Sequence, residues 1–183
     1  MNALSLLCPT DDPELQVFKD MASRLRQRRA LRERSDIRPR VELQSQHLAV
    51  SGGQTSVAMA INTFTHGALT DYDVAARYGY SFLRALQSEC PGVYRDWGQM
   101  TAHSELWEKA VRPSLSKGVG VLIGLNGEFA AQARGQVVLI VALLGQDQVV
   151  YADPTTGSFR TTTRAAMENC PAHPEGKFVF AAA

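Results

Sequence analysis

The chain has 183 residues, which is enough for one domain with a hydrophobic core and too few for two ordinary domains. Its apolar fraction of 45% is typical of globular proteins, and no apolar run reaches the about 18 residues that a membrane-spanning helix requires. The net charge of +1 excludes a strong overall bias toward nucleic acids or membranes.

The first predicted element is a long helix that begins near Asp12 and Pro13, because Asp is a common helix cap and Pro fits the first turn. The stretch from Lys19 to Arg40 contains nine basic and three acidic residues. One interpretation is the solvated face of an amphipathic helix, and the other is a contact for an acidic partner, a nucleic acid or an anionic membrane surface. No aromatic residues are interleaved with these arginines, so the signal for nucleic-acid binding is not strong.

This helix is predicted to break at Ile37-Arg38-Pro39-Arg40, because proline restricts its own backbone and that of the preceding residue. The sequence therefore predicts two parts, a basic amphipathic N-terminal segment over residues 1–40 and a folded domain over residues 41–183. Val41-Glu42-Leu43 is predicted to be a short strand or an extended arm at the start of that domain.

The centre of the chain is the stretch Ser51-Gly52-Gly53-Gln54-Thr55-Ser56, followed by the apolar run Val57–Phe64. The two glycines predict a tight turn, and Thr55 and Ser56 can cap the start of a buried helix. Such a turn aims backbone N–H groups and the positive end of the helix dipole at one point. That setting favours a catalytic thiolate, but the stretch contains no cysteine.

Two further helices are predicted, one capped by Thr70 or Asp71 and one over Glu105–Leu115, with an irregular segment over Glu89–Gly98 between them. The first of these helices is expected to carry on one face Val74, Ala75, Tyr78 and Phe82.

The last third of the chain is rich in β-branched residues and turn signals, which predict strands. The predicted strands are Val119–Leu125, Val137–Leu143, Val149–Ala152, Ser158–Thr162 and Lys177–Phe180. Short turns at residues 145–148 and 153–157 indicate antiparallel hairpins. Helices followed by an antiparallel meander predict an α+β domain.

The cysteines and the N-terminus bear on the compartment. Cys8, Cys90 and Cys170 cannot all pair with one another, which favours a reducing compartment, and Met1–Cys8 does not have the pattern of a signal peptide. We therefore expect a cytoplasmic protein, although export without a signal or delivery into another cell would leave the same pattern. Cys90 is expected to be exposed.

No cofactor is expected. The spacing of Cys170 and His173 resembles that of metal ligands, but without a second close pair we expect no metal site.

Three motifs in this order resemble those of the papain-like fold, and most closely the bacteriocin-processing peptidase family. That family carries a Gln, then an Asp-Cys-Gly turn that opens a helix, then a Gly-His-apolar strand, and then a hairpin that ends in Asn-Asp-Pro with a following Gly. Here Gln46 stands six residues before Gly52, the family's spacing between oxyanion-hole glutamine and nucleophile. The later motifs read Gly135-Gln136-Val137-Val138-Leu139 and Tyr151-Ala152-Asp153-Pro154-Thr155-Thr156-Gly157. The resemblance spans roughly residues 41–180 and implies a helical N-terminal half packed on a C-terminal antiparallel sheet.

The resemblance also implies a catalytic role for each of four positions, and at two of them the residue present cannot perform that role. Gln46 matches the oxyanion donor and Asp153 matches the third, orienting residue of the triad. Gly52 occupies the position of the nucleophile and Gln136 that of the histidine base. Glycine has no side chain to attack a carbonyl, and glutamine does not shuttle protons near neutral pH. The sequence therefore predicts a pseudoenzyme without catalytic residues.

Other polar residues do not obviously replace the missing groups. Ser51 is adjacent to Gly52 but has no evident base, and His47 precedes the central turn in a segment expected along a cleft wall. His66 and His103 are expected to be loop or surface residues. Asp153 has a second interpretation, because an Asp before Pro commonly caps its own turn.

The predicted function is a non-catalytic papain-like domain, of a bacterial type, that binds a peptide or protein segment in a degenerate cleft. Its candidate binding residues are Gln46, Gly52, Gly53, Gln136 and Asp153. The glycine at position 52 is expected to leave room for a bulkier group. Two alternatives stay open, an effector enzyme whose altered chemistry uses polar groups in the same cleft, and an interaction protein that acts through its Arg-rich helix.

Overall fold

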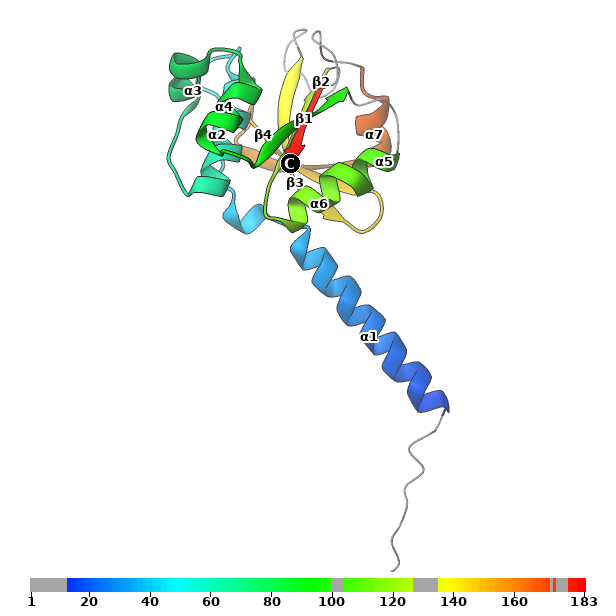
Figure 1. Ribbon diagram of the computed structural model, residues 1–183. Coiled ribbons are helices and arrows are strands. Elements are labelled where there is room, and N and C mark those ends of the chain that lie inside the picture. The colour runs from blue at the N-terminus through cyan, green and yellow to red at the C-terminus, as the bar shows by residue number, and fades with distance from the viewer. Residues whose placement is uncertain (1–12, 100–103, 127–134, 172, 174–177) are drawn as a thin grey trace, which may run out of the picture.

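The structure, a computed structural model, describes residues 13–99, 104–126, 135–171, 173 and 178–183 (Figure 1). Within these residues the chain has an α+β fold with a six-stranded antiparallel sheet in the order β1-β6-β2-β3-β4-β5. The strands are β1 (Tyr94–Gln99), β2 (Val121–Leu125), β3 (Gln136–Leu144), β4 (Gln148–Asp153), β5 (Ser158–Thr163) and β6 (Phe178–Ala182). The predicted α+β class and the two predicted hairpins, β3–β4 and β4–β5, are confirmed.

Helices cover both sides of this sheet. They are α1 (Pro13–Arg34), the 3-10 turn η1 (Arg38–Arg40), α2 (Gly52–Thr65), α3 (Asp71–Tyr78), α4 (Phe82–Glu89), α5 (Ser104–Leu106), the π-helical η2 (Trp107–Val111), α6 (Arg112–Ser116) and α7 (Arg164–Asn169). In Figure 1, α2, α3 and α4 gather on one side of the strands, whereas α5 and α7 lie on the other side.

The core lies around the central strands and α2. All of β2 is buried, as is all of β3 except Leu144. Because alternate side chains of a strand point to opposite faces, such continuous burial requires cover on both faces of the sheet. On one face the cover is α2, whose Ser56 Oγ donates a 2.7 Å hydrogen bond to the carbonyl oxygen of Val137 in β3. This bond fixes the start of α2 against the start of β3.

The segment after α1 joins the body through β3. The pairing of β2 with β3 ends at Val121 and Ile140, and the segment 35–37 lies beside the residues that follow on β3. The Ile37 N–H donates to Val141 O at 2.9 Å, and the Leu143 N–H donates to Ser35 O at 3.2 Å. The predicted boundary at residue 40 stays a prediction, and residues 35–37 are already hydrogen-bonded to the sheet.

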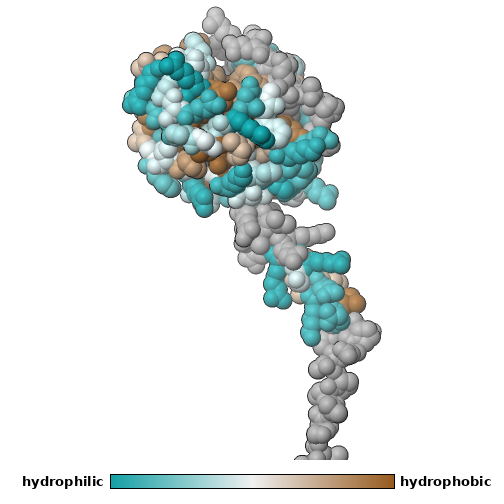
Figure 2. All heavy atoms as spheres, in the orientation of Figure 1, coloured by the Kyte–Doolittle hydropathy of each residue, from teal (hydrophilic) through white to brown (hydrophobic). Residues whose placement is uncertain are grey.

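The predicted N-terminal helix is confirmed as α1, and it extends away from the body (Figure 1). Four of its apolar side chains are more than half exposed, namely Val17, Phe18, Met21 and Leu25. Figure 2 shows this apolar surface beside hydrophilic side chains on the same helix. The described body therefore leaves these apolar side chains of α1 uncovered.

Some predictions of local structure were wrong. Helix α4 begins at Phe82 because the chain turns at Gly79, whose φ of 59° combined with ψ of −117° is favourable only for glycine, so Phe82 does not continue the face of α3. The segment predicted to be irregular includes β1, which pairs with β6 at the edge of the sheet. Helix α7 was not predicted. Cys90 is buried rather than exposed, and this burial, with Glu89 nearby, raises the pKa of its thiol to about 11.

Candidate functional site

The central stretch folds differently from its prediction. Helix α2 begins at Gly52 with Ser51 as its N-cap residue, so the two glycines form the first helical turn and not a turn before it. Thr55 and Ser56 lie inside the helix and do not cap it. The Thr55 hydroxyl instead donates to the Ser51 carbonyl oxygen at 2.9 Å. The structure therefore confirms the buried helix and corrects its first residue.

Close packing requires glycine at position 53, whereas position 52 faces the movable end of a side chain. A Cβ at Gly53 would stand 2.8 Å from Cε2 of Phe82 and closer still to its Cζ, so the ring lies directly on the helix backbone. A Cβ at Gly52 would stand 2.8 Å from Oε1 of Gln46 and 3.6 Å from Cγ of Pro154. The space beside Gly52 is thus filled by Gln46 and Pro154, and the prediction that it stays open for a bulkier group was wrong.

A cavity of about 250 Å³ lies at the N-terminus of α2. Its lining residues come from the loop before α2, the first turn of α2, the α3–α4 connection, the start of β3 and the turn after β4. They are Gln46, Ala49, Val50, Gly52, Gly53, Gln54, Tyr80, Phe82, Gly135, Gln136, Val137, Thr155 and His173. Three of these are glutamines, and none is Asp, Glu, Lys, Arg or Cys. Among the described residues, the lining therefore combines glutamine amides with apolar side chains and contains no Asp, Glu, Lys or Arg.

Four of the five predicted binding residues line this cavity, namely Gln46, Gly52, Gly53 and Gln136. They come from separate parts of the chain, since Gln46 precedes α2 and Gln136 begins β3. The main-chain N–H of Gln46 donates to the carbonyl oxygen of Pro154 at 2.7 Å, which ties the loop before α2 to the turn after β4. The fold thus brings the three sequence motifs to one place.

The fifth predicted residue, Asp153, lies behind the wall and holds Gln136. Gln136 Nε2 donates to Asp153 Oδ1 at 3.1 Å and to Thr155 Oγ1 at 2.7 Å. Asp153 is 6% exposed and also accepts the Thr155 N–H at 2.9 Å, while Arg160 Nε pairs with its Oδ2 at 3.0 Å. Asp153 therefore caps its own turn and also holds the side chain of Gln136, and its match to the third residue of a triad stays a prediction.

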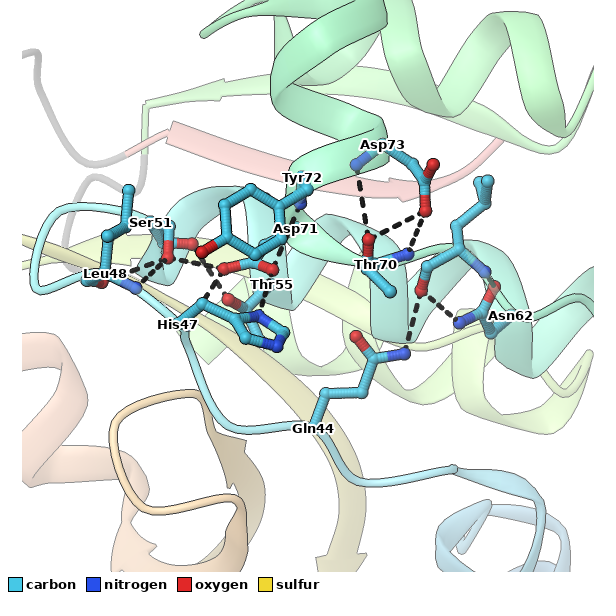
Figure 3. Close-up of polar contacts among 11 residues, drawn as sticks. Gln44, His47, Leu48, Ser51, Thr55, Asn62, Thr70, Asp71, Tyr72 and Asp73 are labelled. Atoms are coloured by element: carbon cyan, nitrogen blue, oxygen red, sulfur yellow. Dashed lines mark hydrogen bonds and ion pairs between the residues drawn. The ribbon is translucent and has the colours of Figure 1, made fainter.

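A second polar cluster, which the sequence analysis missed, fixes the loop that carries Gln46 (Figure 3). Asp71 is 1% exposed and accepts hydrogen bonds from the Ser51 hydroxyl at 2.6 Å and from the His47 N–H at 3.0 Å. His47 Nδ1 lies 2.5 Å from the other carboxylate oxygen. Burial alone would raise the pKa of Asp71, but the hydrogen bonds from Ser51 and His47 outweigh it and hold this pKa below 3.8.

The order of contacts in this cluster does not make a nucleophile. Asp71 lies between Ser51 and His47, so the histidine ring contacts the carboxylate and not the hydroxyl. The Ser51 oxygen also accepts the Leu48 N–H at 3.1 Å and is nearly buried. A triad would need the base to bind the nucleophile directly. The cluster therefore fixes the backbone from His47 to Ser51. Its three side chains lie far apart in the sequence, so no sequence motif indicated that they would meet.

The remaining candidates are His66, His173, Cys170, Cys8 and His103, and of these His173 lines the cavity. His66 is the C-cap of α2 in a left-handed conformation with φ 56°, and His173 lines the cavity and packs its ring 5.3 Å from that of Phe178. Cys170 is buried and its thiol donates to the carbonyl oxygen of Asn126. Cys8 and His103 lie outside the described residues. Among the described residues, no group of His, Cys, Asp and Glu is arranged to hold a metal ion.

No protein-family model matches this chain, and no curated protein matches it significantly. In the part of the chain that the structure describes, no helix is both long enough and apolar enough to cross a membrane. Arguments about function therefore depend on the site itself.

Proposed function

We propose that this chain is a non-catalytic, papain-like pseudoenzyme that binds an extended peptide or protein segment in the cavity at the N-terminus of α2. The observation that carries the proposal is the meeting of Gln46, Gly52 and Gln136 at one cavity, with Asp153 behind Gln136. These are the four positions at which the sequence resembles the papain-like motifs. We place the protein in a reducing compartment, the bacterial cytoplasm.

The composition of the cavity suits a peptide. A bound main chain offers alternating N–H and C=O groups, and the cavity wall offers glutamine amides, which both donate and accept hydrogen bonds. Apolar side chains of the peptide would meet Phe82 and Val137 in the wall and the exposed Val50 and Tyr80 at its rim. Exposed apolar groups beside a cavity that offers a few polar groups are typical of interaction sites.

The same residues argue against a reaction. Position 52 has no side chain, and the amide of Gln136 is held by Asp153 and Thr155. An enzyme of altered chemistry would need Ser51 as its nucleophile, but that hydroxyl is bound to Asp71 and nearly buried. Binding without turnover is therefore the function that this site supports best.

Photo-crosslinking tests the proposal directly. We would replace Tyr80, at the rim, with the photoreactive p-benzoylphenylalanine and mix the protein with a pool of N-acetylated random hexapeptides. The matched control carries the same group at Phe64, an exposed aromatic residue near the other end of α2, about 18 Å along the helix from Gly52. We expect peptide adducts at position 80 and not at 64, with no new peptide termini in the mass spectrum.

Two results would overturn the proposal. Equal or absent labelling at positions 80 and 64 would mean that the cavity does not bind peptides. Peptide cleavage that disappears in an Asp153→Asn variant would mean that the site is catalytic.

A second candidate function rests on α1. Its exposed apolar residues, together with the nine basic residues from Lys19 to Arg40, fit an acidic protein partner. Binding through this helix should weaken steeply with salt and be lost in an Arg24→Glu/Arg26→Glu variant, whereas binding that survives high salt would count against it.

A further inference from the structure

Helix α1 has an apolar face that the described body does not cover, since the helix projects away from the body (Figure 1). Its exposed apolar residues are Val17, Phe18, Met21 and Leu25. In an α-helix these four positions fall within about 100° of arc around the helix axis. A stripe of that width is typical of a helix that packs against another element.

A projecting helix needs such packing. Helix α1 has 22 residues, and most of the stability of a protein helix comes from packing of an apolar face rather than from helix propensity. The hydrogen bonds between residues 35–37 and β3 hold the chain only after the last turn of α1. The stretch from Val17 to Leu25 is therefore where a partner would stabilise the helix.

The charges of this segment are divided along its length. Residues 11–20 contain four acidic residues and one basic residue, whereas residues 21–34 contain six basic residues and one acidic residue. Two parallel copies would set like charges against each other. Two antiparallel copies would set the acidic start of each against the basic end of the other, and such complementarity determines which partner and which orientation a helix selects.

We propose that α1 pairs in an antiparallel direction with the α1 of a second copy of this chain, through the apolar face from Val17 to Leu25. Pairing centred near Ser23 sets Met21 of one copy against Leu25 of the other. The two bodies then lie at opposite ends of the paired helices, because each body joins the C-terminal end of its own α1 (Figure 1). The acidic stretch of the second copy is thus the acidic partner for these arginines. This inference is independent of the cavity.

The interface is small. Four apolar side chains from each copy, with the charges beside them, place it at the lower end of specific interfaces, below about 1,200 Å² in total. We therefore expect a reversible dimer whose population rises with protein concentration.

Sedimentation velocity of the full chain over a concentration series tests the proposal. Leu25→Glu places a charge within the apolar face and should weaken the dimer at least about tenfold. Ser23→Glu is the matched control, because Ser23 is exposed and lies two residues from both Met21 and Leu25, on the opposite side of the helix. It should leave the dimer intact. Both variants should keep the melting temperature of the body, since the body covers neither side chain.

A charge exchange tests the direction of pairing. Glu14 and Arg32 stand nine residues before and nine residues after Ser23. Glu14→Arg and Arg32→Glu should each weaken an antiparallel dimer by about threefold or more, because each turns attraction into repulsion. The double variant Glu14→Arg/Arg32→Glu should restore it, whereas in a parallel dimer the double variant would still set like charges together.

Each contrary outcome is distinct. A protein that stays monomeric at every concentration would overturn the proposal, leaving α1 to a different acidic partner and leaving peptide binding in the cavity untouched. A dimer that survives Leu25→Glu would place the interface elsewhere and would also overturn it. A double variant that is no stronger than the single variants would contradict antiparallel pairing.

Discussion

Asp71 and Asp153 are both buried near the N-terminus of α2, and they hold different segments beside the cavity. Asp153 follows β4 and binds Gln136, on the side formed by the sheet. Asp71 begins α3 and binds His47 and Ser51, on the side formed by the loop before α2. Neither carboxylate lines the cavity itself.

The two carboxylates differ in how their charge is compensated. Asp153 has a guanidinium partner, Arg160, whose side chain is half exposed and stays hydrated. Asp71 has no Lys or Arg partner among the described residues and depends on hydrogen bonds from Ser51 and His47. Removing Asp71 would thus release a whole loop, whereas removing Asp153 would release a turn and one amide. The two sides of the cavity should therefore respond differently to mutation.

The largest expected effect is that of Asp71→Ala. Ser51 loses its shortest hydrogen bond and the backbone N–H of His47 loses its acceptor, so the free energy of unfolding should fall by about 2–4 kcal/mol. Urea unfolding followed by circular dichroism measures this change. Asp147→Ala, at an exposed position in the β3–β4 turn, is the control and should change the stability by less than about 0.5 kcal/mol. A loss no larger than that of the control would mean that the Asp71 cluster does not stabilise the loop.

Asp153→Ala should destabilise the fold less, by about 1–2 kcal/mol, since Arg160 and Thr156 remain accessible to water. Its clearer effect should be local, because the Gln136 amide keeps only Thr155 as its partner. The side-chain amide resonances of Gln136 should shift and broaden while those of Gln44, bonded to Leu69 O, stay unchanged. Equal changes in both glutamines would contradict a local role for Asp153.

The neighbouring glycines provide a matched pair of variants, because each faces a different side chain. Gly53→Ala pushes a methyl group into the Phe82 ring and should cost about 1–2 kcal/mol. In Gly52→Ala the new methyl group meets the flexible end of Gln46, which can move aside. Alanine also favours the helix by up to about 1 kcal/mol, so the free energy of unfolding should be unchanged or slightly higher. A Gly53→Ala/Phe82→Leu double variant should recover part of the loss. If both single variants behaved alike, the close contact of Phe82 with α2 would be wrong.

The smallest expected effect is on the pH dependence of stability. The pKa of Asp71 is lower in the folded state than its ordinary value of 3.8. The Asp71 carboxylate therefore contributes its full stabilisation above pH 3.8, and this stabilisation is lost as the pH falls through the lower folded pKa. Between about pH 5 and about pH 2, the wild-type protein should therefore lose more stability than Asp71→Asn does. Parallel curves of the free energy of unfolding against pH for the two proteins would show that the Asp71 pKa is the same in the folded and unfolded states.

The comparison also shows what sequence reasoning can find. Strands β2 and β3 and the long α1 were predicted because hydrophobic runs and helix-start residues are local signals. Gln136 and Asp153 were predicted through short motifs that the resemblance supplied in order. Asp71 was assigned only as a possible cap, although Thr70 is the cap and the Asp71 carboxylate turns inward to the loop before α2. Its partners lie 20 and 24 residues away, and no local pattern encodes such a contact.

The start of α2 was misplaced for a similar reason. Two adjacent glycines usually indicate a turn, but here Gly53 packs against the Phe82 ring and Gly52 lies against the end of the Gln46 side chain. Both contacts are tertiary, so the sequence could not reveal that the glycines are helical. The short strand β1 was missed because it lies at the sheet edge and only its partner β6 defines it.

The most direct test of the account is whether filling the cavity abolishes peptide binding. The binding isotherm of the fluorescently labelled hexapeptide pool would be measured for wild type, for Ala49→Trp in the cavity wall, and for Ala76→Trp on the exposed face of α3. All three proteins should keep the same melting temperature, because both alanines are exposed. The account predicts that Ala49→Trp weakens binding at least about tenfold while Ala76→Trp matches wild type. Equal affinities for all three proteins would contradict it, because the peptide would then bind elsewhere and the cavity at the N-terminus of α2 would not be the site.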